Sequence, residues 1–518
     1  MDRAVPQGTH VLTTRPGRVR RPRTASRLTL ASLVVVAVLA VIGIMAVGKP
    51  SPPAVYKIRT REPVAATSVL TGSPSAVSTA TAHLLLAAAP TVVVANEASG
   101  ADVASAAAIA ARVHAPLLLA AAGPLAAGLR AEIKALAPTA VLAVGLSAQA
   151  VAAGLPRIKV ITTPRGLHRA PVAVPLRHVL VLVHKATSAA ALAAMTTARV
   201  AGAQVVTLAG YDPRVNPGVI RAIAAVKPQR VVGIGAGFGP ASRLGARVAV
   251  AATGVQLPGG GQVLFPMRRI VALYGNPQSS LLGALGEQDL PASIVRAERV
   301  AAQYRPLSRV PVIPAFEIIA TVAEGSPGPT GSYSYEMPVA DLRPWVQAAT
   351  AAHMYVILDL QPGRDNFLAQ AKRYEPLLKL PNVGLALDPE WKLQPGQVPL
   401  QQIGSVNIAE VNSVVTWLAA LTARYHLPQK LLELHMFRLS MIQGEAQLDT
   451  RNDDLAIVVN MDGQGAPGSK NQTWAAITAA APKGVFFGWK DFYVKDTPMM
   501  DPQETINHTP EPVLISYE

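Results

Sequence analysis

The most continuous apolar stretch of the chain lies near its N-terminus. Residues 28–47 include no charged side chain, and at about 1.5 Å rise per residue a helix of this length crosses a hydrocarbon core of about 30 Å. Seven arginines and one aspartate precede the stretch, and such a basic flank stays on the cytoplasmic side. The pattern predicts a basic cytoplasmic tail at 1–27, a transmembrane helix at 28–47 and an extracytoplasmic remainder.

A cleaved signal peptide is the alternative interpretation of this stretch. The apolar core of a signal peptide runs about 7–15 residues and ends at a small-x-small site, whereas this core is longer and is followed by the poor site GIMAVGKP. The chain has no cysteine, which excludes a lipidated cysteine, disulfides and thiolate metal sites. We therefore expect the helix to hold the protein in the cell membrane as a single-pass anchor.

Beyond the anchor, the apolar pattern changes twice. Residues 48–82 are rich in Pro, Ser, Thr and Ala with little periodicity, which is typical of an extended linker. From residue 83, short Val/Leu runs alternate with Ala-rich stretches of helical length, which predicts strands joined by crossover helices. The predicted strands of this α/β domain, 83–260, are 91–95, 116–120, 140–145, 179–183, 204–210 and 230–235.

The order of these segments repeats along the α/β domain. Pro116 in the first half corresponds to Gln204 in the second, an offset of 88 residues, and Gly145 corresponds to Gly235, an offset of 90. Two tandem units of similar length predict an internal duplication.

Both units resemble the cell-wall-binding type 2 repeat of Gram-positive surface proteins. The likeness lies in an Ala-rich helix that leads into 115–119, a helix near 129–136, a strand that ends at 144–145, and the equivalents in the second unit. The resemblance covers about 83–255. It implies noncovalent attachment to an anionic wall polymer.

The region 261–518 has a different texture. All five tryptophans lie in it. Eight apolar runs, most of them separated by segments of helical length, occupy 268–275, 310–319, 354–361, 383–391, 430–437, 455–463, 484–490 and 512–518. This count and length are typical of a (β/α)8 barrel. The predicted fold class is thus α/β: one N-terminal transmembrane helix, a duplicated α/β repeat domain and a (β/α)8 TIM-like barrel.

The net charge of +16 narrows the choice of partners. The N-terminal tail supplies +6 from its seven arginines and one aspartate, and the remaining basic residues are scattered along the chain. A nucleic-acid partner is not expected, because a focused basic patch is missing and the compartment is wrong. Anionic polymers of the cell envelope are the expected electrostatic partner.

Candidate chemistry lies at the ends of the barrel strands, where barrel enzymes assemble their sites. The candidate catalytic residues are Glu390, Asp388, Glu317, Asp359 and Asp491. The candidate substrate-binding residues are Tyr274, Asn276, Trp391, His435, Asp462 and Trp489. Glycosidic hydrolysis needs one carboxyl group that protonates the leaving oxygen and another that acts as nucleophile or activates water.

In architecture and residue types this region resembles glycoside hydrolase barrels. Asp388 and Glu390 stand at i and i+2, so both can point to the same side if the strand continues. The resemblance implies Glu390 as general acid, with Glu317 or Asp491 as its partner. The competing interpretation is structural, since single acids at strand ends also cap helices or pair with a nearby base, as Asp359 can with Arg364.

Other chemistries find little support in the sequence. It contains no HExxH pair and no GxSxG elbow, so neither a bound metal nor another cofactor is expected. The sequence predicts a membrane-anchored bacterial envelope protein that binds wall polymer and hydrolyses or modifies a polysaccharide. The alternative is a noncatalytic surface module that binds glycan or protein. A small-ligand receptor built from 83–260 is disfavoured, because that region has few of the aromatic and acidic residues that line such pockets.

Overall fold

A computed structural model describes residues 57–518. The predicted tail at 1–27, the transmembrane helix at 28–47 and the first residues of the predicted linker lie outside the described residues. Within 57–518, no helix is both long and apolar enough to cross a bilayer.

The described part of the expected linker is folded, which corrects the prediction for 57–82. It contains β1 (Arg59–Thr60), β2 (Thr67–Leu70) and most of α2 (Pro74–Leu85). The hydroxyl of Ser73 accepts a hydrogen bond from the N–H of Ala76 and so caps α2. The buried face of α2 includes Ser78, Thr81 and Ala82. Such small and polar residues give too weak an apolar periodicity to reveal a helix.

The α/β domain contains two four-stranded parallel sheets with the same strand order. The first sheet runs β5 (Leu117–Ala120), β4 (Thr91–Asn96), β6 (Ala140–Val144), β7 (Lys159–Ile161). The second runs β9 (Gln204–Leu208), β8 (Val179–His184), β10 (Arg230–Ile234), β2. All six predicted strands are confirmed. The shared order agrees with a duplication, although the fourth place is taken by β7 in one sheet and by β2 in the other.

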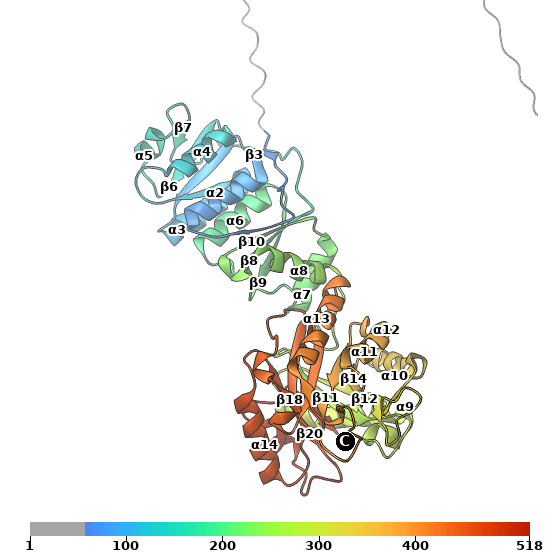
Figure 1. Cartoon of the computed structure of the whole chain (residues 1–518). Coiled ribbons are helices and arrows are strands. Elements are labelled where there is room, and N and C mark those ends of the chain that lie inside the picture. The colour runs from blue at the N-terminus through green and yellow to red at the C-terminus, as the bar shows by residue number, and fades with distance from the viewer. Residues whose placement is uncertain (1–56) are drawn as a thin grey trace, which may run out of the picture. The chain divides into compact units, whose positions relative to one another are not determined.

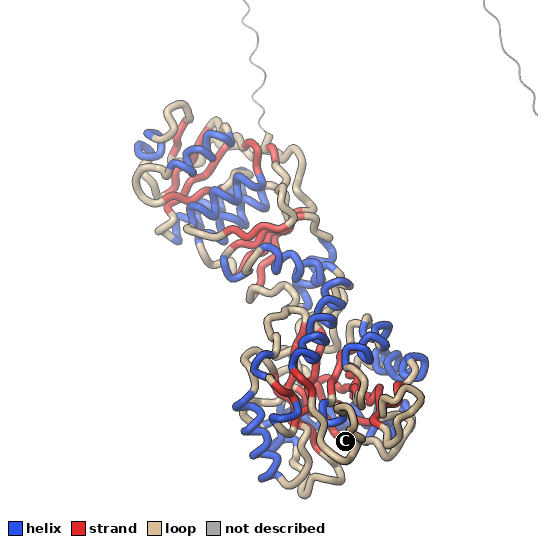
Figure 2. Tube along the Cα trace, viewed as in Figure 1, coloured by secondary structure: helices blue, strands red, loops and turns tan. Residues whose placement is uncertain are grey.

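Helices cover both faces of these sheets, as Figures 1 and 2 show. They are α2, α3 (Gly100–Val113), α4 (Ala127–Leu136), α5 (Ala148–Ala153), α6 (Ala189–Val200), α7 (Pro217–Val226) and α8 (Ala241–Ala252). A short strand, β3 (Leu86–Ala88), pairs antiparallel with β1. In β4, Val92 and Val94 enter one hydrophobic cluster while Val93 and Ala95 enter another. Burial on both faces explains why these strands are continuously apolar.

The C-terminal domain is a closed barrel of eight parallel strands. They are β11 (Arg269–Gly275), β12 (Val312–Ala323), β14 (Tyr355–Leu360), β15 (Val383–Leu387), β17 (Lys430–Met436), β19 (Leu455–Met461), β20 (Phe486–Asp491) and β21 (Leu514–Tyr517). Each strand pairs with the next in this order, and β21 pairs with β11 to close the barrel. All eight predicted barrel strands and the TIM-like barrel are thereby confirmed.

The remaining elements of this domain surround the strands. The helices are α9 (Leu290–Tyr304), α10 (Val339–Ala351), α11 (Phe367–Arg373), α12 (Glu375–Leu378), α13 (Ile408–Arg424), α14 (Pro467–Ala480) and α15 (Pro502–Ile506). The short strand β13 (Ser334–Glu336) pairs antiparallel with the end of β12, and β16 (Val406–Asn407) pairs with β18 (Ile442–Gln443).

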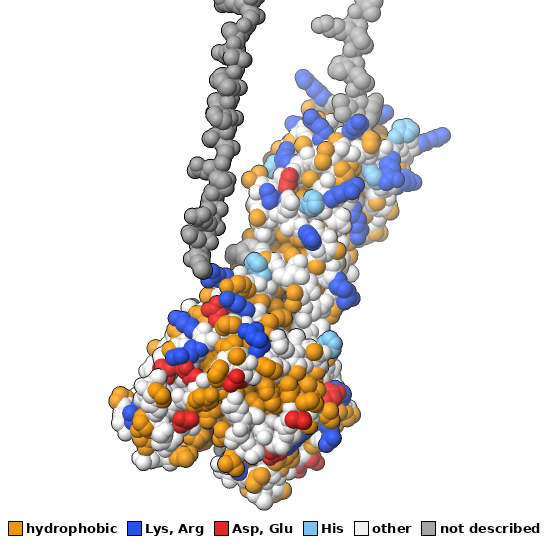
Figure 3. All heavy atoms as spheres, turned by 90° about the vertical axis from the view of Figure 1, so that its right-hand side faces the viewer, with side chains coloured by type: hydrophobic (Ala, Val, Ile, Leu, Met, Phe, Trp, Pro, Cys, Tyr) orange, Lys and Arg blue, Asp and Glu red, His pale blue; other side chains and the backbone are white. Residues whose placement is uncertain are grey.

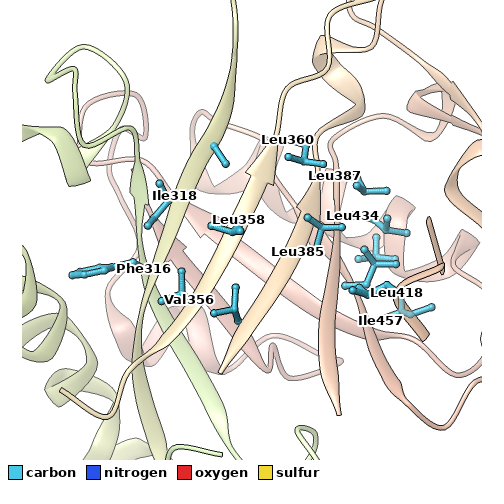
Figure 4. Packing of buried hydrophobic residues seen from close by; sticks show 14 of the residues in the cluster. Phe316, Ile318, Val356, Leu358, Leu360, Leu385, Leu387, Leu418, Leu434 and Ile457 are labelled. Carbon is cyan, nitrogen blue, oxygen red and sulfur yellow. The ribbon is translucent and has the colours of Figure 1, made fainter. Parts of the chain in front are cut away.

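Alternation along each strand divides the barrel into two apolar cores. Phe316, Ile318, Val356 and Leu358 belong to the core between the strands and the surrounding helices, as Figure 4 shows. Ile313, Ala315, Tyr355 and Ile357 belong to the core inside the barrel. Because successive side chains point to opposite faces, the next inward positions, Glu317 and Asp359, continue this interior toward the carboxyl ends of the strands.

The outer core predicts a large effect for a single truncation. Leu358 is fully buried, whereas Leu281 is 91% exposed. Leu358→Ala should lower the free energy of unfolding by about 2–5 kcal/mol, because it removes buried methyl groups and leaves a cavity. Leu281→Ala should change it by less than about 0.5 kcal/mol. Urea unfolding of both variants measures the difference, and equal losses would contradict the burial described here.

Candidate functional site

The inward positions at the carboxyl ends of the strands are polar on all eight strands. They are Tyr274 (β11), Glu317 (β12), Asp359 (β14), Asp388 after β15, Glu433 and His435 (β17), Asn460 (β19) with Asp462 after it, Lys490 (β20), and Ser516 (β21) with Glu518 after it. This polar layer lies on the interior side of the barrel, above the inner apolar core. Barrel enzymes build their sites at this end.

An open pocket of about 650 Å³ lies over this layer. Its lining includes the acids Asp388, Glu390, Asp462 and Glu518, the bases Arg438, Lys490 and Lys495, and the aromatic residues Tyr274 and Trp391. A second hollow of about 400 Å³ shares Glu390, Trp391 and Arg438 with it. A pocket in the range of about 300–1,000 Å³ with several convergent polar groups has the character of a ligand site.

Glu390 is held at the pocket by a short 3-10 turn, Pro389–Trp391. The carboxylate of Asp388 accepts a hydrogen bond of 3.2 Å from the N–H of Glu390, and the N–H of Gly404 donates to the Glu390 carbonyl at 2.7 Å. Burial and the nearby charge of Asp462 raise the pKa of Glu390 to about 7. At neutral pH this side chain therefore exists partly as a carboxylic acid, which can donate a proton.

Asp462 lines the same pocket in a very different environment. Its carboxylate lies 3.1 Å from Nζ of Lys490 and 3.0 Å from Nδ1 of His435. Burial opposes the ionisation of Asp462, but the attraction of Lys490 and His435 outweighs it and lowers the pKa of Asp462 to about 2. One oxygen from each of Asp388, Glu390 and Asp462 lies within 4.8 Å of the other two. The pocket thus brings together a proton-bearing carboxyl group and an ionised one.

Lys490 fixes this arrangement from β20. Besides Asp462, its ammonium group contacts the carboxylate of Glu518 at 2.9 Å and lies 3.3 Å from the centre of the Tyr274 ring. These acids hold the pKa of Lys490 well above its usual value, even though burial works against the charged form. Lys490 is therefore a permanent cation at the base of the pocket.

Beneath the pocket, His435 stands among carboxylates. Its Nε2 lies 2.8 Å from Glu317 and 3.2 Å from Glu433, and all three side chains are fully buried. Burial opposes protonation, yet Asp462 and Glu433 raise the pKa of His435 well above its usual value. Burial also raises the pKa of Glu317 to about 7.

Asp359 lies in the same deep layer. It accepts a hydrogen bond of 3.0 Å from the Tyr274 hydroxyl, and burial raises the pKa of Asp359 to about 7. The pairing with Arg364 considered from the sequence is not found. The guanidinium of Arg364 instead donates to the carbonyl of Gln397 at 2.6 Å and stacks over Tyr333.

Two residues predicted to line the mouth point away from it. Trp489 and Asp491 flank the inward Lys490, so alternation turns both toward the helices. The Trp489 ring packs against Trp474 with centroids 5.6 Å apart, and its N–H donates to Asp491 at 2.7 Å. Asp491 also lies 3.7 Å from Lys470. These contacts make Asp491 part of a buried network behind the barrel wall and correct its assignment as a catalytic partner.

Asn276 and Glu317 also differ from expectation in position. The amide of Asn276 donates to the Ile319 carbonyl at 3.0 Å, and its oxygen accepts from the N–H of Gln278 at 2.8 Å. It thus stabilises the loop after β11 and does not line the pocket. Glu317 lies in the layer below the pocket beside His435, so it cannot face Glu390 across a substrate. The acids that line the pocket with Glu390 are Asp388, Asp462 and Glu518. Of these, Asp462 was expected only to bind substrate.

Seven residues of the site were missed in the sequence: Glu433, Arg438, Asn460, Lys490, Lys495, Ser516 and Glu518. Alternation would have revealed five of them, all except Arg438 and Lys495. Glu433 stands two residues before His435, and Lys490 stands two residues after Gly488 on the inner face of β20. Arg438 follows β17 in a loop, where no periodic signal predicts its direction.

The α/β domain carries a separate feature, a basic surface. Residues 57–260 include 19 Lys and Arg but only five Asp and Glu, whereas residues 261–518 include 20 and 25. On the face in Figure 3, the α/β domain shows many basic and few acidic side chains. Two hollows flank the loop 163–170, and exposed Arg165, His168 and Arg169 line both. Such a surface attracts polyanions.

The eight parallel strands define the C-terminal domain as a (β/α)8 barrel, with an open pocket at the carboxyl ends of the strands. No protein-family model matches the chain, and no curated protein matches it. The resemblances to cell-wall-binding type 2 repeats and to glycoside hydrolases therefore stay predictions.

Proposed function

We propose that this chain is a membrane-anchored protein of the bacterial cell envelope whose barrel hydrolyses glycosidic bonds in a polysaccharide. The observation that carries the proposal is the pair formed by Glu390 and Asp462. Both line one open pocket, one oxygen of each lies within 4.8 Å of the other, and of the two acids only Asp462 is ion-paired with Lys490. Two carboxyl groups in contrasting environments over one pocket suit a general acid and a nucleophile.

In the proposed reaction, the Glu390 carboxylic acid protonates the glycosidic oxygen as Asp462 attacks the anomeric carbon. The leaving sugar departs as an alcohol, and a covalent glycosyl ester forms on Asp462. Glu390, now a carboxylate, takes a proton from water, and that water cleaves the ester. The short carboxyl separation favours this double displacement, because retaining enzymes hold the two groups about 5–5.5 Å apart and inverting enzymes about 6.5–9.5 Å.

The surrounding residues would position the sugar and the nucleophile. Lys490 keeps Asp462 ionised and fixes its orientation. Trp391, which lines both the pocket and the adjoining hollow, offers an aromatic face to a sugar ring. The hollow that adjoins the pocket leaves room for a further residue of a polymer.

The basic surface of the α/β domain supports the second half of the proposal, the binding of an anionic wall polymer. Arg165, His168 and Arg169 stand beside Arg112 or Lys159 in the two hollows, and neither hollow is lined by an acid. Contacts of this kind weaken as salt screens them. The predicted N-terminal anchor would keep both domains at the outer surface of the membrane.

The experiment is to purify the full chain in detergent, screen it on an array of envelope polysaccharides, and analyse the products formed from each polymer it binds. We expect binding of an anionic polymer that weakens with salt, and new reducing ends from a bound glycan. Binding without any new reducing end would overturn the hydrolase and leave the noncatalytic module. The absence of binding to every polymer would overturn the proposal as a whole.

The pH dependence of hydrolysis follows from Glu390. The titratable and charged groups that line the pocket with it are Asp388, Asp462, Glu518, Lys490, Lys495 and Arg438. Because the acid form is required and the pKa of Glu390 is about 7, kcat/KM should fall about tenfold per pH unit above that value.

The pH profile can be tested with one substitution. Lys495 lowers the pKa of Glu390, so Lys495→Gln should move the alkaline limb to higher pH. Initial rates between pH 5 and 10 measure the limb. A limb that moves to lower pH in the variant, or a profile that stays flat to pH 9, would contradict the assignment.

A further inference from the structure

The imidazole of His435 has an unusual relation to its two nearest carboxylates. Glu317 and Glu433 approach Nε2 to 2.8 and 3.2 Å. Within the described residues, however, Nε2 makes no hydrogen bond that satisfies normal angles, and neither oxygen of Glu317 has a hydrogen-bond partner. Both carboxylates therefore approach Nε2 closely without forming a hydrogen bond to it.

Ligands around a small cation have this geometry. With metal–ligand distances of about 2.0–2.1 Å, neighbouring ligand atoms stand about 2.8–3.0 Å apart in an octahedral site and about 3.3–3.4 Å apart in a tetrahedral site. The separations at Nε2 are 2.8 and 3.2 Å. One ligand atom from each of Glu317, Glu433 and His435 lies within 4.8 Å of the other two. One ion could therefore bind all three groups, whereas a proton on Nε2 can point at only one acceptor.

The groups behind these side chains orient them as ligands. The other ring nitrogen of His435, Nδ1, lies 3.0 Å from Asp462, and Asn460 donates to the carboxylate of Glu433 at 2.5 Å. Metal-bound histidines commonly donate their second N–H to a carboxylate, and bound carboxylates are themselves hydrogen-bonded. One oxygen of Glu433 and one of Asp359 also have no hydrogen-bond partner in the described structure.

We propose that Glu317, Glu433 and His435 bind one divalent transition-metal ion inside the barrel, beneath the pocket. One imidazole and two carboxylates suit Zn²⁺, Mn²⁺ or Fe²⁺ better than Mg²⁺ or Ca²⁺, which prefer oxygen alone. The ligands come from β12 and β17, which are separated in the barrel by β14 and β15. The ion would therefore tie opposite sides of the barrel together, and this role goes beyond the proposed hydrolysis.

The first test measures metal content and thermal stability of the full chain purified in detergent without chelator. Elemental analysis should find one ion per chain. Removal of the ion should lower Tm by about 5 °C or more, because an ion that binds only the folded state stabilises it. Added Zn²⁺ or Mn²⁺ should restore Tm, and Mg²⁺ should not. These readouts do not depend on whether the barrel hydrolyses a glycan.

Matched variants locate the ion. Glu433→Gln and Glu317→Gln keep the side-chain size and should lose the metal, whereas Asp491→Asn, a buried acid on the outer face of the same barrel, should retain it. If the first two variants do not fold, the Mn²⁺ spectrum of the wild type by electron paramagnetic resonance reports nitrogen coordination without any substitution. The proposal is wrong if the wild type binds no ion and chelator leaves Tm unchanged, or if folded Glu433→Gln and Glu317→Gln keep the metal.

Discussion

Replacing Asp462 by Asn should lower kcat for the polysaccharide by about 10⁴-fold or more, because the variant loses the carboxylate that acts as the nucleophile. The substitution keeps the shape of the side chain but removes the charge that Lys490 stabilises at 3.1 Å. Reducing-end release by the full-length variant measures the loss. In Asp462→Gly, which removes the side chain and leaves space for an external nucleophile, a small anion such as azide should restore part of the rate and give a glycosyl azide of inverted configuration.

Asp491→Asn is the control for Asp462→Asn. It also alters a buried acid near β20, but Asp491 faces Trp489 and Lys470 on the outer side of the barrel. Its rate should stay within about tenfold of the wild type, since it touches no reacting group. An Asp462→Asn variant that hydrolyses as fast as Asp491→Asn would remove Asp462 from the mechanism.

The second large effect concerns the proton donor. Glu390→Gln should lower kcat about 10²–10⁴-fold on a natural polysaccharide, because glutamine cannot protonate the departing oxygen. Binding of the polymer should be nearly unchanged, since the amide has the same size and retains polar contacts. On an aryl glycoside with a nitrophenolate leaving group the loss should be much smaller, because that group departs without a proton.

Glu336→Gln serves as the matched control for Glu390. The carboxyl group of Glu336 also has a raised pKa from burial, but it pairs with Arg373 and lines a different hollow. It should leave hydrolysis unchanged. Equal losses on natural and aryl substrates in Glu390→Gln would contradict a role as general acid.

Most strands could be predicted from the sequence, because a strand that is buried on both faces is apolar at successive positions. Val179 to Val183 and Tyr355 to Leu358 are unbroken apolar runs, and in parallel sheets such runs mark strands covered by helices on both sides. The barrel followed from eight of these runs with helical connections. The early part of the α/β domain was missed, because α2 buries Ser78 and Thr81 in place of larger apolar side chains.

The site was predicted only in part, and the errors have one geometrical cause. A position at the carboxyl end of a strand places a residue near the pocket, but only alternation decides whether its side chain points inward. Trp489 and Asp491 lie at the correct end of β20, but their side chains point outward. Lys490, between them, points inward. Contacts between distant strands, such as Glu317 to His435 at 2.8 Å, have no local signal. The position of a residue along its own strand does not show which residue of a distant strand lies beside it.

The most direct measurement of the central claim is a time course of reducing-end release from the polysaccharide that the full chain binds. Wild type and Glu390→Gln should be compared at pH 6, with polymer binding measured for both. We predict steady release by the wild type and release slower by about 10²-fold or more in the variant, with equal binding. Equal rates of release, or equal binding with no release by either protein, would contradict a catalytic pocket at the barrel mouth.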